Sequence, residues 1–206
     1  IGNDTDSNPT DPCLPAQLAG YTGYDASNAI WSAADCDGDG IDNGTEVING
    51  TDPYLSDLVV FDVQVFLEGP LSGESMSTSL NDFDYLPGEA NNPVAGHPYS
   101  GAPWNHTDYT GMEYGDGGIP YPATVVDWVM ISVRSNGFLA QREVYRAAAL
   151  LHADGTVEIP AAEERLLLSS LGVNNYIVIE HRNHLAIMSD RVRVSSGNVL
   201  SFDFRA

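Results

Sequence analysis

The stretch Val125-Val-Asp-Trp-Val-Met-Ile-Ser-Val-Arg134 is strongly apolar and rich in β-branched side chains. Such side chains pack well on a pleated surface, so the stretch predicts a buried strand that carries Trp128. Glu143–His152 and Thr156–Ile159 are the next strand candidates, and Ala153-Asp-Gly155 separates them. An Asp-Gly pair between two such runs favours a hairpin, because glycine tolerates the positive φ of a tight turn.

Further strand candidates lie on both sides of this hairpin. Leu58–Glu68 alternates, with Phe61, Val63, Val65 and Leu67 on one face. The remaining candidates are Tyr176–Arg182, Arg191–Val194 and Val199–Phe204. About seven short strands with turn residues between them predict a mostly β fold, an immunoglobulin-like or transthyretin-like β-sandwich over residues 58–206. About 150 residues are enough for one hydrophobic core.

A long insertion, residues 69–123, separates the first two strand candidates. It is rich in glycine, proline, asparagine and aromatic residues. Loops of this length in a compact domain are usually functional or disordered, and the aromatic content argues against disorder. Three alternatives stay open: a lid over its own sandwich, a platform for sugar rings, or a surface that contacts a neighbouring subunit. The aromatic side chains that would contact a ligand or a subunit are Tyr99, Trp104, Tyr109, Tyr114 and Tyr121.

The segment Asp35-Cys-Asp-Gly-Asp-Gly-Ile-Asp-Asn-Gly-Thr-Glu46 has the residue pattern of a calcium loop. Carboxylates occupy its first, third and fifth positions, a glycine permits the sharp turn, and the final glutamate can bind bidentately. Calcium is a hard cation that takes roughly six to eight oxygen ligands, so closely spaced acids favour it over a solvated acidic turn. The expected ligands are Asp35, Asp37, Asp39, Glu46, the backbone carbonyl of Ile41, and Asn43 directly or through water.

The acidic pattern continues beyond this loop. Residues 49–57 read Asn-Gly-Thr-Asp-Pro-Tyr-Leu-Ser-Asp and add Asp52 and Asp57 as candidate ligands. The run from 35 to 57 resembles the bacterial thrombospondin type 3-like calcium repeat, and the resemblance implies a structural spacer in secreted or surface proteins. A sensor would need an amphipathic helix on each side, whereas Ala26–Ala34 allows only a short one. A second ion is a further alternative at Asp4, Asp6 and Asp11.

Cys13 and Cys36 are the only two cysteines. A disulfide between them closes a loop of about two dozen residues and stabilises the fold by roughly 3 kcal/mol; two free buried thiols are the alternative. A cystine and a calcium loop both indicate an extracellular or cell-surface location. No run approaches the about 18 apolar residues of a membrane span. We expect residues 1–57 to form an acidic calcium-repeat segment, and the chain to be excised from a larger precursor.

The charge of the chain is strongly asymmetric. There are 29 acidic and eight basic residues, all eight are arginines, and all lie at or after Arg134. A surface this negative repels phosphates, so nucleic acid and anionic membranes are unlikely partners. The absence of lysine excludes intramolecular Lys–Asn isopeptide bonds and polymerisation through a lysine. Any assembly must therefore rest on packing, strand pairing, calcium or cystine.

Four segments, residues 103–113, 125–134, 147–155 and 176–185, are similar to a β module found near the C-terminus of large secreted proteins of Bacteroidota. The resemblance covers about residues 58–204 and implies no catalytic activity. The chain also lacks a Gly-x-Ser-x-Gly elbow, a phosphate-binding glycine loop and a His-Glu-x-x-His motif. The best remaining constellation is His181 and His184 with His152 and Asp127. His181 shares a strand face with Ile177 and Ile179, so we expect a core histidine more than a zinc ligand.

These patterns together predict a non-catalytic extracellular structural protein, a calcium-stabilised subunit of a surface fibre. Copies of the same chain are the expected partners, because the final strand offers an edge for strand addition. The alternative is an adhesive, carbohydrate-binding or spacer module of a larger secreted protein, with glycans as ligands.

Overall fold

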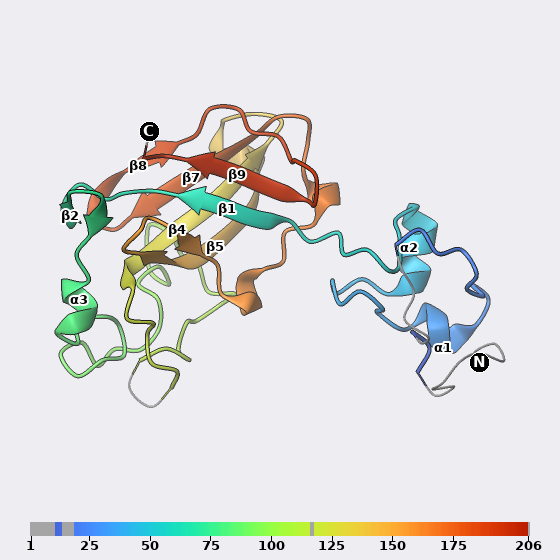
Figure 1. Cartoon of the computed structure of the whole chain (residues 1–206), viewed down its shortest axis with the longest axis horizontal. Coiled ribbons are helices and arrows are strands. Elements are labelled where there is room, and N and C mark those ends of the chain that lie inside the picture. The colour runs from blue at the N-terminus through green and yellow to red at the C-terminus, as the bar shows by residue number, and fades with distance from the viewer. Residues whose placement is uncertain (1–10, 14–18, 116–117, 206) are drawn as a thin grey trace. The chain divides into compact units, whose positions relative to one another are not determined.

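The computed structural model describes residues 11–13, 19–115 and 118–205 (Figure 1). The chain divides into two compact units, Ile1–Leu58 and Val59–Ala206. The proposed second ion site falls partly outside the described residues, because only Asp11 of its three acids is described. No helix in the described ranges is long and apolar enough to cross a membrane.

The first unit contains two short helices, α1 (Ala29–Ser32) and α2 (Asn43–Asn49). Asn28 caps α1 by accepting hydrogen bonds from two backbone N–H groups of its first turn, and Asp42 caps α2 by accepting from the backbone N–H of Thr45. Gly50 ends α2 with a φ of 78°, the left-handed conformation that glycine adopts without strain. Beside α1 the ring of Trp31 stacks on Tyr24 at a centroid distance of 4.3 Å.

Five antiparallel strands form the main sheet of the second unit, in the order β6–β5–β4–β7–β8. A parallel pair, β1 with β9, lies across one face of this sheet (Figure 1). The strands are β1 (Val60–Gln64), β4 (Val125–Ser135), β5 (Glu143–His152), β6 (Val157–Glu158), β7 (Asn175–His181), β8 (His184–Met188) and β9 (Val199–Asp203). The shorter elements are β2 (Leu71–Ser72), β3 (Ser75–Met76), α3 (Ser79–Asp82), η1 (Ala140–Arg142), η2 (Ala161–Glu163) and η3 (Leu168–Ser170).

The central strands β4 and β5 are buried on both faces, and each face contributes to a separate hydrophobic core. Val129 and Ile131 of β4 point to the core under β1 and β9, where Val63 and Leu200 pack. Because side chains alternate along a strand, Trp128 and Met130 point to the opposite face. The mostly β fold predicted from the sequence is therefore confirmed, with two cores on the two faces of one sheet.

The insertion covers the second of these faces. Trp128 lies at its centre and is fully buried; its indole N–H donates to the Tyr121 hydroxyl over 2.9 Å. The Tyr99 hydroxyl donates to the carbonyl of Trp128 over 2.8 Å. Tyr109 is also buried, while Trp104 and Tyr114 are partly buried against the same core. Three of these five side chains are buried and two are partly buried against this core, so the insertion packs over its own sheet; their contact with a ligand or a subunit stays a prediction.

Two strand boundaries differ from the prediction. Arg191–Val194 was expected to be a strand, but only Val192 forms a bridge, with Asn175 at the start of β7. The neighbouring segment β8 instead pairs along β7, although it was not expected to be a strand. Because β8 occupies the edge of β7, the alternating segment 191–194 pairs with the sheet only through Val192 and Asn175.

Candidate metal centre

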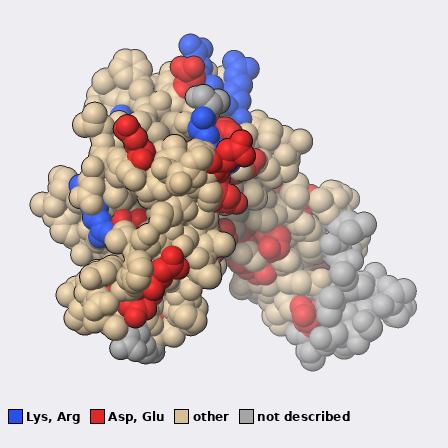
Figure 2. Space-filling view, turned by 60° about the vertical axis from the view of Figure 1, so that its left-hand side comes forward, with Lys and Arg blue, Asp and Glu red and all other residues tan. Residues whose placement is uncertain are grey.

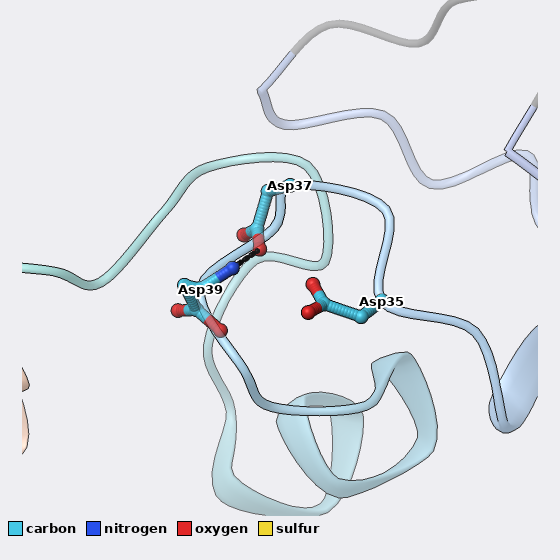
Figure 3. Close-up of side chains that lie close together, drawn as sticks. All are labelled: Asp35, Asp37 and Asp39. Carbon is cyan, nitrogen blue, oxygen red and sulfur yellow. Dashed lines mark hydrogen bonds between the residues drawn. The ribbon is translucent and has the colours of Figure 1, made fainter. Parts of the chain in front are cut away.

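Three carboxylates converge in the loop that precedes α2. One carboxylate oxygen from each of Asp35, Asp37 and Asp39 lies within 4.8 Å of the other two. Figure 3 shows the three side chains around one turn of the loop, with the backbone N–H of Asp39 donating to the Asp37 carboxylate. Within the described parts of the chain this is the one group of three or more acidic, histidine or cysteine side chains close enough to share a metal ion.

The backbone of the loop fixes these carboxylates. The N–H groups of Gly38 and Gly40 donate to the two oxygens of Asp35, over 2.8 and 3.0 Å. Both glycines have a positive φ, 79° and 89°, which an L-side chain rarely adopts. Asp39 in turn accepts from the backbone N–H of Ile41 over 2.9 Å. Each carboxylate is thereby anchored through its own loop, and the glycines explain why the chain can turn so tightly.

Glu46 is the feature that most needs a partner. It extends from α2, its side chain is 0 % exposed, and neither carboxylate oxygen has a hydrogen-bond partner among the described residues. A buried, unpaired carboxylate is costly, so such groups either retain a proton or bind a cation. Burial, and then the charges of Asp37, Asp39, Asp57 and Asp35, raise the pKa of Glu46 to about 7. The loop carboxylates are therefore near enough to Glu46 to disfavour its charged form.

Burial also raises the pKa of two more carboxyl groups, those of Asp37 and Asp57. Burial raises the pKa of Asp37 to about 6, and its charged neighbours Asp39 and Asp35 add to the effect. One of the Asp37 oxygens, Oδ2, is also buried and has no hydrogen-bond partner among the described residues. The pKa of Asp57 is raised by burial and by Asp39 and Asp52. A cation among these groups would offset both the desolvation and the mutual repulsion.

The other expected ligands have different positions. The amide oxygen of Asn43 accepts from the Cys36 N–H over 3.1 Å, and its amide nitrogen donates to the Trp31 carbonyl over 2.8 Å. Asn43 thus braces the loop through its amide, and its role as a ligand, directly or through water, stays a prediction. The carboxylate of Asp52 accepts from the backbone N–H groups of Gly20 and Tyr54, so it too is engaged elsewhere.

Asp57 remains attached to the loop. Its backbone N–H donates to the Asp39 carboxylate over 2.9 Å, so the last part of the first unit is tied to the centre of the loop. The backbone N–H of Ile41 donates to Asp39, and its carbonyl stays a predicted ligand. The carboxylates that the structure brings together are therefore Asp35, Asp37 and Asp39, and Glu46 and Asp57 stay predicted ligands.

A disulfide joins Cys13 and Cys36, as the sequence predicted, at a sequence separation of 23. Cys36 lies inside the acidic loop, and its Sγ also accepts from the Asn43 amide over 3.1 Å. The backbone N–H of Cys13 donates to Asp11 over 2.9 Å. The disulfide therefore ties the N-terminal segment to the acidic loop.

The histidines form separate pairs. His181 is buried, as expected, and binds Asp127 over 3.1 Å, while Arg182 forms a bidentate ion pair with the same carboxylate. His184 contacts His181 through their Nδ1 atoms over 2.8 Å. His152 lies apart and bonds to Thr124 and Glu158. The buried Asp127–Arg182 pair was not anticipated, although a lone aspartate in an apolar strand is a signal for it.

The remaining charges are distributed unevenly over the surface. Figure 2 shows acidic side chains on both units and basic side chains gathered on the second unit, as the positions of the arginines require. No protein-family model matches this chain, and no curated protein or solved structure is similar to it. The resemblance to calcium repeats and to Bacteroidota modules therefore stays a prediction from the sequence.

Proposed function

We propose that this chain is a non-catalytic, extracellular structural protein whose first unit is held together by a bound calcium ion. The observation that supports this most is Glu46, a fully buried carboxylate whose two oxygens lack partners beside three converging aspartates. In the absence of a cation, this arrangement would place several like charges in a poorly solvated site. A divalent cation supplies the missing partner for each of them.

Calcium fits the donors better than other common metals. All of the available side-chain ligands are carboxylates, and the one nearby cysteine, Cys36, is held in a disulfide. Zinc prefers histidine nitrogen and thiolate sulfur. Magnesium needs near-ideal octahedral geometry and keeps much of its water, whereas calcium accepts more oxygens and a bidentate glutamate such as Glu46.

The surroundings favour a structural role over a signalling role. Helix α1 has four residues and α2 has seven, so neither offers the long amphipathic helix that a calcium sensor rearranges. The loop instead adjoins three parts of the first unit: the disulfide at Cys36, helix α2 with Glu46, and the last part of the unit through Asp57. An ion at this position would hold these parts in one arrangement.

Association with copies of the same chain belongs to the proposal. Strand β9 has β1 as its single strand partner among the described residues, which leaves its second edge for strand addition. The carbohydrate-binding alternative loses its main support, because the aromatic side chains that would stack on sugars are packed on Trp128. A spacer within a larger secreted protein remains compatible with the same calcium site.

Thermal unfolding with and without calcium tests the proposed role. Extracellular calcium modules bind with Kd values of roughly 0.1 to 1 mM. At the tighter end, about 2 mM calcium would stabilise the first unit by roughly 2 kcal/mol. For a unit of this size, that corresponds to a rise in its melting temperature on the order of 10 °C.

The variant Glu46→Gln should lose most of this calcium-dependent rise, because it keeps the shape and removes the charge. Glu74→Gln, at an exposed glutamate in the second unit, is the matched control and should behave as the wild type. A melting temperature that is the same in calcium and in chelator would refute a structural calcium ion. Equal responses of the two variants would show that Glu46 is not a ligand.

A further inference from the structure

Four of the eight arginines form no ion pair in the described parts of the chain, although the chain holds 29 acidic residues. The arginines that do pair with carboxylates are Arg146, Arg165, Arg182 and Arg205. The unpaired ones are Arg134, Arg142, Arg191 and Arg193. The guanidinium of Arg134 donates to the carbonyl of Phe138 over 2.7 Å, and the other three side chains are exposed. These positive charges are therefore available to carboxylates from outside the chain.

The four unpaired arginines lie at one end of the main sheet, where β4 ends and β5 and β7 begin (Figure 1). In the β4–β5 ladder, Arg134 lies opposite Glu143, the residue that follows Arg142. On the other side of β4, the first residue of β7 forms a backbone bridge with Val192, which separates the remaining two arginines. Neighbouring strands are about 4.8 Å apart, so the four side chains extend from a strip of backbone about 15 Å wide. We call this strip the arginine end.

Exposed apolar side chains lie at the arginine end as well. Phe138, in the β4–β5 loop, is 57 % exposed, and its ring packs edge-on against Tyr176 of β7 at a centroid distance of 6.4 Å. Val173, two residues before β7, is 69 % exposed. Protein interfaces are enriched in aromatic side chains and arginine, and arginine binds a carboxylate through two parallel hydrogen bonds. The arginine end therefore has the composition of a surface that binds an acidic protein.

The first unit of this chain has the complementary composition. Residues 1–58 contain 11 acidic residues and no lysine or arginine. Asp25, before α1, and Asp42, the cap of α2, are both exposed. The same two helices expose large apolar side chains, since Ile30 is 67 % exposed and Ile48 is 86 % exposed. Carboxylates and apolar side chains at these helices match the arginines and apolar side chains of the arginine end.

We propose that the arginine end of one copy of this chain binds the first unit of a second copy, through α1 and α2. The inference rests on the proposed self-association and names its two surfaces. Because these surfaces differ, the contact is heterologous, and it builds a filament when the rotation between copies does not close a ring. The formal net charge of −21 opposes most contacts between copies, whereas at this contact opposite charges meet.

Light scattering on the full chain in calcium, over micromolar to millimolar protein concentrations, tests the contact. The mass of the wild type should rise with concentration from 22.1 kDa to beyond twice that value. Arg191→Gln combined with Arg193→Gln should raise the concentration needed for association by about tenfold or more. Arg165→Gln combined with Arg205→Gln removes the same charge from arginines that already have acidic partners, and should associate as the wild type does.

A variant of the first unit separates this contact from general electrostatics. Ile48→Arg places a positive charge on α2 and should weaken association, although it reduces the net negative charge of the chain. If general repulsion between acidic chains controlled association, this variant would instead associate more readily than the wild type.

Mixing the two defective variants tests whether the surfaces are different. The Ile48→Arg variant keeps its arginine end, and the variant with Arg191→Gln and Arg193→Gln keeps its first unit. At a concentration where each alone is monomeric, an equal mixture should form pairs of twice the 22.1 kDa mass and no larger species.

Three results would overturn the proposal: association that survives both sets of substitutions, a mixture that stays monomeric, or a wild type that stays monomeric. A monomeric wild type that binds dextran sulfate would assign the arginine end to an external polyanion instead. The first of these results would leave self-association standing through another surface. Melting of the same samples with and without calcium reports separately on folding and on the calcium proposal.

Discussion

The raised pKa of Glu46 makes calcium binding depend on pH in a defined way. Calcium binds the ionised carboxylate, so protons compete with the ion below the pKa of about 7. Between pH 8 and pH 6 the ionised fraction of Glu46 falls from about nine-tenths to about one-tenth, which weakens calcium binding about tenfold. Asp37, with a pKa of about 6, contributes a further factor of about two. We therefore expect the Kd for calcium to be about 20-fold larger at pH 6 than at pH 8.

Isothermal titration calorimetry of chelator-treated protein at pH 6, 7 and 8 measures this change. Repeating the titrations in two buffers with different ionisation enthalpies gives the number of protons released for each calcium bound. Glu46→Gln should bind calcium more weakly at every pH, with only about a twofold dependence left from Asp37. Glu74→Gln should retain the wild-type dependence. A Kd that is equal at pH 6 and pH 8 in the wild type would refute the reasoning.

Protonation of Glu46 weakens calcium binding but stabilises the folded state of the metal-free protein. The pKa of Glu46 is about 7 in the folded chain and 4.5 as its ordinary value, so the folded state binds the proton more tightly. The resulting stability is complete below pH 4.5 and is lost as the pH rises through 7; it amounts to roughly 3 kcal/mol. In chelator at pH 8, Glu46→Gln should therefore unfold at a higher temperature than the wild type. In calcium the order should reverse.

Three further predictions concern the disulfide, the second core and assembly. Reducing Cys13–Cys36, or replacing both residues by serine, should lower the free energy of unfolding of the first unit by roughly 3 kcal/mol in denaturant titrations, and an unchanged midpoint would argue against that role. Trp128→Ala should destabilise the second unit by about 3–5 kcal/mol and leave the Kd for calcium unchanged in calorimetry; a weaker Kd would mean that the two units are coupled. Negative-stain electron microscopy should show ordered filaments in millimolar calcium that come apart after chelation, and single small particles in both conditions would contradict fibre assembly.

Much of the second unit was predictable because its strands are locally encoded. The apolar run that includes Trp128 and the Asp-Gly turn at Gly155 are short-range signals, and β4 and the β5–β6 hairpin follow them closely. Strand β8 was missed because His184–Met188 is short and shows no apolar–polar alternation. Arg191–Val194 alternates well but lacks a partner strand beyond Asn175, and a local pattern does not report which partners are available.

The candidate metal centre was also predictable only in part. The spacing of Asp35, Asp37 and Asp39 sets their convergence, because a tight glycine turn leaves few other arrangements. The position of Asn43 was not predictable from spacing, since its amide is held by Cys36 and Trp31, two contacts that exist only once the disulfide and α1 are in place. The pairing of Arg182 with Asp127 joins β4 to the β7–β8 turn over a separation of 55 residues. The aspartate in an apolar strand indicates that a partner exists, but no local pattern indicates which residue it is.

The central claim is that an ion occupies the acidic loop and completes the shell of Glu46. Anomalous X-ray diffraction from crystals grown in millimolar calcium tests it most directly, because calcium scatters anomalously and water does not. We predict one anomalous peak within about 2.3–2.6 Å of carboxylate oxygens of Asp35, Asp37, Asp39 and Glu46. An ordered loop with no such peak, with Glu46 still buried and unpaired, would contradict the account.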